Sequence, residues 1–269
     1  MEKPIISILK NNTKLSADTF ILVREKLLKR GFDVREEFSP QSKLIVSIGG
    51  DGATLDTVHK CNFPSIPVVG INTGHLGFFQ EVDQNTLDEF IKNYTEGRYC
   101  LQPLNPVEAI ISFKETEKTE SVKGLNEIVI RGGEYFPAHL SLYIGGSFIE
   151  KYTGDGLLVA TSSGSTAYNY SLGGSIVDPR IKLLQVTPIA PMNTTAYRSF
   201  TSSILLPWDL ALEIKPEYIK SDKTHIIADG FETAVTKADK ITIKVSSSIV
   251  NLVRFSHYDF WEKVKGKFL

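Results

Sequence analysis

Short apolar runs alternate with helix-patterned segments over the first hundred residues, and this alternation constrains the fold more than any other feature. The apolar runs cover residues 5–9, 44–48 and 68–71. Segments with apolar residues spaced for one helix face open at Ser16, follow the glycine-rich run at 49–52, and cover residues 86–94. The order strand, helix, strand, helix, strand predicts a parallel sheet with crossover helices.

The pattern changes near Pro103 and Pro106. Beyond this point short β-rich runs are separated by turn residues, and the glycine pairs at 132–133 and 145–146 are typical of hairpin turns. The β-rich runs cover residues 107–113, 128–130, 140–144, 148–151, 157–160, 204–206, 210–214, 225–228, 241–245 and 249–255. We therefore expect an N-terminal α/β parallel-sheet domain over residues 1–103 and a C-terminal β-rich, sandwich-like domain over 104–255. The aromatic and basic segment 256–269 is expected to pack back on the first domain, with Phe260 and Trp261 as anchors.

Composition excludes several classes of protein. Lys plus Arg is 30 and Asp plus Glu is 31, for a formal charge of −1, whereas nucleic-acid-binding proteins usually carry a basic excess. No stretch approaches 18 consecutive apolar residues, so no transmembrane helix and no membrane partner are expected. With no export signal and two isolated cysteines, Cys61 and Cys100, the expected compartment is the reducing cytoplasm.

The strongest local signal is Gly49-Gly50-Asp51-Gly52, which lies between a predicted buried strand and a predicted helix. In open α/β sheets, ligands bind at this end of the strands. Glycines allow backbone N–H groups to approach phosphate oxygens, and a helix N-terminus favours anions. An aspartate in such a loop can accept a proton from an attacking hydroxyl or hold a metal. The alternative is a plain turn in which Asp51 caps the helix.

Other nucleotide-binding and catalytic motifs are missing from the sequence. There is no GxxxxGK[ST], no GxGxxG after a strand, no kinase HRD or DFG set, no GxSxG and no HExxH. The five histidines have no spacing typical of metal ligands, and neither cysteine lies in a CxxC pair. We therefore assign no metal ligand to a protein side chain.

Two more loops combine glycines with polar and aromatic residues. Asn72 to Phe79 follows the third predicted strand and is compatible with a loop shaped around a flat ligand, or with a plain turn capped by core aromatics. Thr161 to Tyr168 carries many hydroxyl groups after the run 157–160. Such a loop offers donors and acceptors to a polar ligand, with Tyr168 able to stack on a ring, although it is also compatible with a solvent loop.

Taken together, these segments resemble the NAD kinase family, which phosphorylates the adenosine 2′-hydroxyl of NAD. That family carries a GGDG loop, an N-x-G-x-LGF segment, an Asn-Glu or Asn-Asp pair, a GDG and a TPTGSTAY run in this order. Here they stand at residues 49–52, 72–78, 126–127, 154–156 and 161–168. Ser162 and Ser163 replace the usual Pro-Thr, and Phe231 stands where Gln is common after the Asp-Gly that begins at Asp229.

The resemblance implies a role for each matching position. Asp51 is expected to be the general base. Gly49, Gly50 and Gly52 are expected beside the phosphates of the donor. The expected contacts to NAD are Asp51, Gly52, Phe78, Asn126, Glu127, His139, Thr153, Asp155, Thr166, Ala167, Tyr168, Ser171 and Ala190. The resemblance also implies ATP or polyphosphate as donor, a divalent metal such as Mg²⁺, and a homo-oligomer, a dimer or a tetramer.

Two other functions compete with this one. A lipid kinase of the diacylglycerol or sphingosine type shares the GGDG loop and the two-domain plan, but Asn126-Glu127 and the Gly164–Tyr168 run count against it. A dinucleotide-binding regulator without catalysis is the other, and the presence of Asp51 counts against that.

Overall fold

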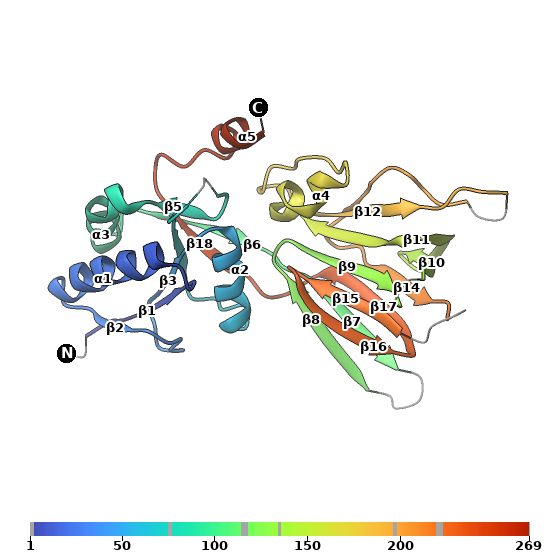
Figure 1. The fold of residues 1–269 in the computed structure, drawn as a ribbon, viewed down its shortest axis with the longest axis horizontal. Helices are drawn as coiled ribbons and strands as arrows, with labels where there is room; N and C mark the ends of the chain where they lie inside the picture. The colour runs from blue at the N-terminus through green and yellow to red at the C-terminus, as the bar shows by residue number, and fades with distance from the viewer. Residues whose placement is uncertain are drawn as a thin grey trace. The chain divides into compact units, whose positions relative to one another are not determined.

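The structure is a computed structural model, and it describes residues 3–74, 77–113, 118–133, 136–195, 198–218 and 223–268. The chain forms two compact units, one of residues 1–104 with 248–269 and the other of residues 105–247 (Figure 1). Each unit is described by itself. No helix of the described residues is long and apolar enough to cross a membrane.

The first unit is an α/β unit with a mainly parallel sheet, as predicted. Its strands run in the order β2-β1-β3-β4-β18-β6, and β5 pairs with β4. β1 to β5 pair in parallel, whereas the edge strand β6 is antiparallel to β18. The strands are β1 (Ile5–Lys10), β2 (Asp33–Arg35), β3 (Leu44–Ile48), β4 (Val68–Ile71), β5 (Gln80–Val82), β6 (Cys100–Leu104) and β18 (Val250–Arg254), and the helices are α1 (Lys14–Lys29), α2 (Asp51–Lys60), α3 (Leu87–Thr95), α5 (Phe260–Phe268) and the 3₁₀ turn η1 (Gln84–Thr86).

The strand β18 corrects one expectation from the sequence. The run 249–255 was expected in the β-rich domain, but β18 lies between β4 and β6, with Leu252 opposite Val68. Its apolar pattern suits either sheet, and long-range pairing decides between them. Val253 packs in the same core as Ile6, Val46 and the buried face of α1.

The second unit is an antiparallel β-rich unit, also as predicted. Its strands run in the order β16-β15-β9-β11-β10-β14-β17-β7-β8, while β12 pairs with β11 and β13. The strands are β7 (Val107–Phe113), β8 (Thr119–Gly124), β9 (Glu127–Gly132), β10 (Ala138–Ile144), β11 (Ser147–Thr161), β12 (Leu183–Pro191), β13 (Ile204–Pro207), β14 (Leu212–Pro216), β15 (Lys223–Ala228), β16 (Phe231–Thr236) and β17 (Ala238–Val245), with the short helical turns η2 (Ser163–Thr166) and α4 (Tyr168–Ser171).

The two predicted glycine hairpins have different outcomes. Gly145 and Gly146 both adopt positive φ and connect β10 to β11, which pair from Ile144 to Ser147 onwards. The pair at 132–133 does not form a hairpin, because β9 pairs with β11 and β15 rather than with β10. The runs 148–151 and 157–160 belong to one long strand, β11, which passes through the glycines at 154 and 156 without a turn.

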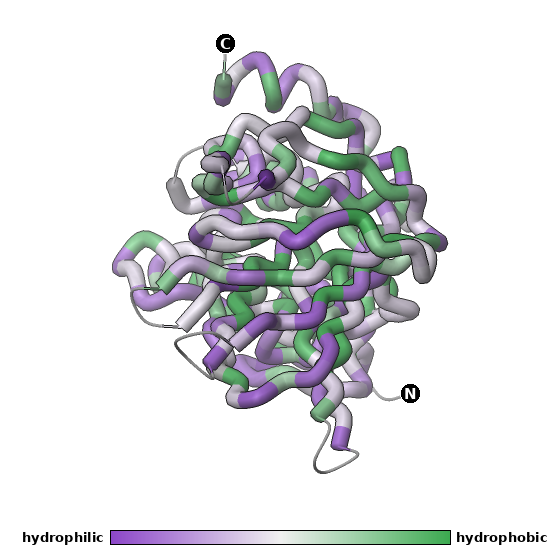
Figure 2. Tube along the Cα trace, turned by 90° about the vertical axis from the view of Figure 1, so that its right-hand side faces the viewer, coloured by the Kyte–Doolittle hydropathy of each residue, from purple (hydrophilic) through white to green (hydrophobic). Residues whose placement is uncertain are grey.

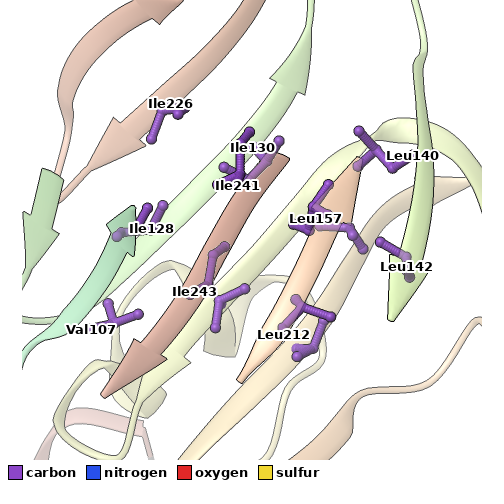
Figure 3. Close-up of a cluster of buried hydrophobic side chains, with 14 of the residues drawn as sticks. Val107, Ile128, Ile130, Leu140, Leu142, Leu157, Leu212, Ile226, Ile241 and Ile243 are labelled. Atoms are coloured by element: carbon purple, nitrogen blue, oxygen red, sulfur yellow. The ribbon is translucent and has the colours of Figure 1, made fainter. Parts of the chain in front are cut away.

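The core of the second unit consists of apolar side chains from alternate positions of its strands. Val107, Ile128 and Ile130 lie among Leu157, Ile241 and their neighbours in one buried cluster (Figure 3). Hydrophobic and hydrophilic residues alternate along many of the strands (Figure 2), as expected for strands with one buried face.

Candidate active site

The glycine loop at 49–52 connects the end of β3 to the start of α2. Gly49 has φ +148°, and a Cβ at this position would lie 2.4 Å from the Cβ of Ala53, so the turn requires glycine. A Cβ at Gly50 or Gly52 would meet nothing within 4 Å. The start of α2 therefore has open space beside it, at the helix end that favours anions.

Asp51 is the first residue of α2, and its carboxylate turns away from the helix cap. The cap position belongs to Gly50, which has no side chain to form a capping hydrogen bond. Asp51 Oδ2 accepts a hydrogen bond from the backbone N–H of Phe78 at 3.1 Å, and Oδ1 accepts one from Phe79 at 3.0 Å. The two neighbouring N–H groups fix the carboxylate against the segment that follows β4. This contact counts against the interpretation of Asp51 as a simple helix cap.

The segment Gly77–Glu81 is held from its other side by Arg254 on β18. The buried guanidinium donates to the carbonyls of Phe78 and Phe79 at 3.0 and 3.3 Å and to Glu81 Oε2 at 3.0 Å. A Cβ at Gly77 would lie 2.5 Å from Asp51 Oδ1, so only glycine fits against the carboxylate. The N–H groups of residues 78 and 79 thus bond to Asp51 while their carbonyls bond to Arg254, and this holds the carboxylate in place.

Asn72 and Phe78 differ in their surroundings. Asn72 forms a local turn with Gly74, whose N–H donates to Asn72 Oδ1 at 3.0 Å, while His75 and Leu76 lie outside the described residues. Phe78 is 7% exposed and packs against Phe260 and Phe268 of α5. This arrangement favours a core role for the Phe78 ring within this unit.

In the second unit, Asn126 and Glu127 are buried and have unpartnered oxygens. Asp229 has φ +51° and accepts hydrogen bonds from the N–H groups of Leu125, Asn126 and Glu127 at 2.6, 2.8 and 3.2 Å. Among the described residues, Asn126 Oδ1 and Glu127 Oε2 have no hydrogen-bond partner. Burial, reinforced by the charge of Asp229, raises the pKa of Glu127 to about 8. Buried polar atoms without partners are rare, and a polar ligand would satisfy these two.

The hydroxyl-rich run at 161–168 is tied to the same pair. Thr161 N donates to the carbonyl of Asn126 at 2.8 Å, and a Cβ at Gly164 would lie 2.0 Å from that oxygen. The two serines that depart from the family pattern are also engaged: Ser162 donates to the carbonyl of Ile181 and Ser163 to that of Leu125. Thr166 ends η2, Ala167 follows it, and Tyr168 and Ser171 begin and end α4.

Arg131 contacts Tyr168 and lines a cavity together with Asp155. The hydroxyl of the exposed Tyr168 accepts a hydrogen bond from Arg131 Nη2 at 3.1 Å, and the buried Arg131 Nε has no hydrogen-bond partner in the part of the chain that the structure describes. Arg131 and Asp155 line a cavity of about 510 Å³ together with His225 and Glu232. The cavity lining therefore combines side chains of both signs of charge.

Ala190, His139 and Thr153 lie on strands next to that cavity wall. Ala190 has φ +44° and lies across from Asp155, between the pairs Gly154–Pro191 and Gly156–Ile189. His139 Nδ1 lies 3.1 Å from Thr153 Oγ1 and lines a smaller cavity of about 210 Å³. Thr153 itself is buried, so His139 is the member of this pair that borders open space.

The predicted residues therefore fall into two groups. Asp51, its glycines and Phe78 belong to the first unit, and the remaining predicted residues belong to the second. Sequence analysis missed Arg254, Arg131 and Lys267, whose Nζ lies 3.4 Å from Asp51 Oδ2, and gave Asp229 no role. The dipeptide Asp229-Gly230 was a usable signal, because Asp-Gly is typical of a two-residue hairpin turn. Both residues have positive φ and connect β15 to β16. The others were not detectable, because long-range contacts alone bring them to the site.

Comparison with known proteins assigns the family. Residues 7–99 match the family model of the ATP-NAD kinase N-terminal domain, and residues 125–255 match that of the C-terminal domain. The chain is 36% identical over 267 residues to an NAD kinase of Finegoldia magna, covering 98% of both chains. The chain belongs to the NAD kinase family. A second relative, an NAD kinase of Lactobacillus johnsonii, is 32% identical over 96% of this chain and 95% of its own.

Solved structures of the NAD kinase family have the same fold. A yeast NADH kinase in complex with NADH superposes with a TM-score of 0.84 at 22% identity, covering 98% of this chain and 87% of that chain. An NAD kinase from Archaeoglobus fulgidus in complex with ATP gives 0.77 at 24% identity, covering 97% and 98%. The parallel-sheet unit followed by the antiparallel unit is thus the family's architecture.

Proposed function

We propose that this protein transfers the γ-phosphoryl group of ATP to the adenosine 2′-hydroxyl of NAD, giving NADP and ADP. The observation that carries the proposal is the Asp51 carboxylate, fixed by two backbone N–H groups at the start of α2. Phosphoryl transfer depends mostly on positioning and electrostatics, and the attacking hydroxyl must lose a proton. A fixed carboxylate beside an anion-favouring helix end meets both needs.

In the proposed reaction, the 2′-oxygen of NAD forms a bond to the γ-phosphorus while the bond from that phosphorus to the bridging oxygen of ADP breaks. Asp51 accepts the proton of the hydroxyl. The open space beside Gly50 and Gly52 would receive the phosphates of the donor, with backbone N–H groups near them. A rigid carboxylate needs no reorganisation when the hydroxyl arrives.

A divalent metal, Mg²⁺ for instance, fits this scheme as part of the nucleotide. Among the described residues, no group of three or more His, Cys, Asp or Glu side chains is placed to hold a metal ion. Mg²⁺ keeps several waters and is held largely by substrate phosphates, so the donor phosphates would carry it without a cage of protein side chains. When bound, the metal would neutralise charge on the transferring group.

In the second unit we propose that Asn126, Glu127 and the 161–168 run bind the adenosine part of NAD. The two unpartnered oxygens would form hydrogen bonds with ribose hydroxyls or with the adenine ring. Arg131 and Asp155 give the neighbouring cavity charges of both signs, and Tyr168 is exposed enough to stack on a ring. Thr166, Ala167, Ser171, Ala190, His139 and Thr153 complete the proposed NAD contacts.

We also propose that the protein is a cytoplasmic homo-oligomer. Two observations support this: both cysteines are free thiols, and short strands have edges that need cover. A light-scattering mass near the monomer's 29.9 kDa would reject the oligomer, and fractionation outside the cytoplasm would reject the compartment.

The direct test of function is a coupled assay. The protein is incubated with NAD, ATP and Mg²⁺, and an NADP-specific dehydrogenase reports the product. Polyphosphate replaces ATP in a parallel reaction to compare the donors. NAD binding without turnover would favour a regulator, and turnover of diacylglycerol or sphingosine would favour the lipid kinase.

A further inference from the structure

The last helix, α5, contacts the residues that position Asp51. Lys267 Nζ lies 3.4 Å from Asp51 Oδ2 and 4.8 Å from the centre of the Phe78 ring. One turn earlier, Lys263 donates to the carbonyls of Gly77, at 3.1 Å, and of Gln80. Two lysines of one helix face are thus directed at the proposed catalytic carboxylate and at the segment that holds it.

An aromatic cluster fixes the position of α5 on this segment. Phe78 lies between Phe260 and Phe268, with ring centroids 5.8 and 5.9 Å apart. Since Lys267 lies next to Phe268 in the chain, this packing sets where its ammonium group stands. Burial, followed by the positive charge of Arg254, lowers the pKa of Lys263 to about 8, which shows how closely that lysine is enclosed.

Stability alone does not account for Lys267. The Asp51 carboxylate already accepts hydrogen bonds from two backbone N–H groups. The side chains of Lys267 and Asp51 are 36% and 26% exposed. Partly exposed ion pairs contribute little to folding. Lys265 shows the contrast on the same helix, because it pairs with Glu262 on the surface, where both side chains are 69% exposed.

We propose that Lys267 is a positioning residue for Asp51 in phosphoryl transfer, an inference that rests on the proposed function. The two N–H groups hold the carboxylate from the side of Phe78 and Phe79, and the ammonium group holds Oδ2 from α5. The ammonium also offsets the negative charge of Asp51 where the donor phosphates must approach. It acts on the reaction through the placement and charge of the carboxylate.

The test uses Lys267→Met, which keeps the apolar stem over Phe78 and removes the charge. We expect kcat to fall about tenfold and the KM for NAD to stay within threefold of wild type. The fall in kcat is smaller than the roughly 10²-fold loss that a 1 Å misplacement of a catalytic group can cause. Lys267→Arg should recover kcat to within threefold of wild type. The matched control Lys265→Met, on the same helix, should leave both constants unchanged.

A second readout is independent of activity. Hydrogen exchange of the Phe78 and Phe79 amides should accelerate in Lys267→Met and stay at the wild-type rate in Lys265→Met, because loosening the carboxylate exposes those N–H groups. A wild-type protein that does not phosphorylate NAD would reject the proposed function, while this exchange would still test the Lys267–Asp51 contact. The inference is overturned by a Lys267→Met kcat within twofold of wild type, by an equal loss in Lys265→Met, or by unchanged exchange.

Discussion

Replacement of Glu127 by Gln should make the protein more stable at neutral and alkaline pH. Glu127 is 8% exposed, and its pKa rises from 4.5 to about 8, chiefly because burial penalises the charged form. Between these values the folded protein holds a proton that the unfolded chain has released. Stability therefore falls as pH rises from about 4.5 to about 8.

The size of the effect follows from the same shift. Each pH unit in that window costs about 1.4 kcal/mol, so the cost of keeping Glu127 buried is about 3 kcal/mol at pH 7 and approaches about 5 kcal/mol above pH 8. Gln has the same shape and does not titrate. We expect Glu127→Gln to recover much of this free energy at pH 7 and to match wild type near pH 4.5.

The assay is urea unfolding at several pH values from 4.5 to 8.5. Glu217→Gln is a control of opposite sign, because hydrogen bonds from Ser141 and then Lys151 lower the pKa of Glu217. A lowered carboxyl pKa contributes stability above the unfolded value, so this variant should lose a little stability at neutral pH and converge with wild type in acid. Parallel stability curves for wild type and Glu127→Gln from pH 5 to 8 would refute the reasoning.

Two further substitutions test the second unit. Tyr168→Ala should weaken NAD binding by about 1–3 kcal/mol if the ring stacks on the ligand, and Tyr168→Phe should be milder, losing only the hydrogen bond from Arg131; unchanged NAD affinity with a large fall in melting temperature would reject stacking. Gly164→Ala would place a Cβ 2.0 Å from the carbonyl of Asn126, so it should lower both the melting temperature and NAD affinity, and a variant with wild-type values of both would contradict the close contact.

Local pattern predicted the elements of the first unit well. The apolar runs became β1, β3 and β4, and the helix expected to open at Ser16 is α1, with Gly31 at φ +87° just beyond its end. The signals that identify them, which are short apolar runs, helix-face spacing and turn residues, are all local in the sequence. The strand β18 was misplaced because its partners in β4 and β6 lie far from it in the chain.

The site was predictable in part for the same reason. Asp51 and the 161–168 run could be recognised in the sequence because their local composition is unusual. The residues that hold them in place have no such signal. Asp229 accepts a hydrogen bond from Leu125, 104 positions away in the chain, and Lys267 contacts Asp51, 216 positions away. No local pattern carries such pairings, and single Asp or Lys residues are common on surfaces.

The measurement that tests the central claim most directly is the turnover of Asp51→Asn. Asn keeps the shape of the side chain and removes its basicity, and loss of a general base usually costs about 10²–10⁴ in rate. NAD affinity should stay within about tenfold of wild type, since the amide still offers a hydrogen bond and a negative charge near phosphates is removed. We therefore predict that kcat collapses while the Kd for NAD is nearly unchanged. A variant that keeps more than half of the wild-type kcat would show that Asp51 is not the base.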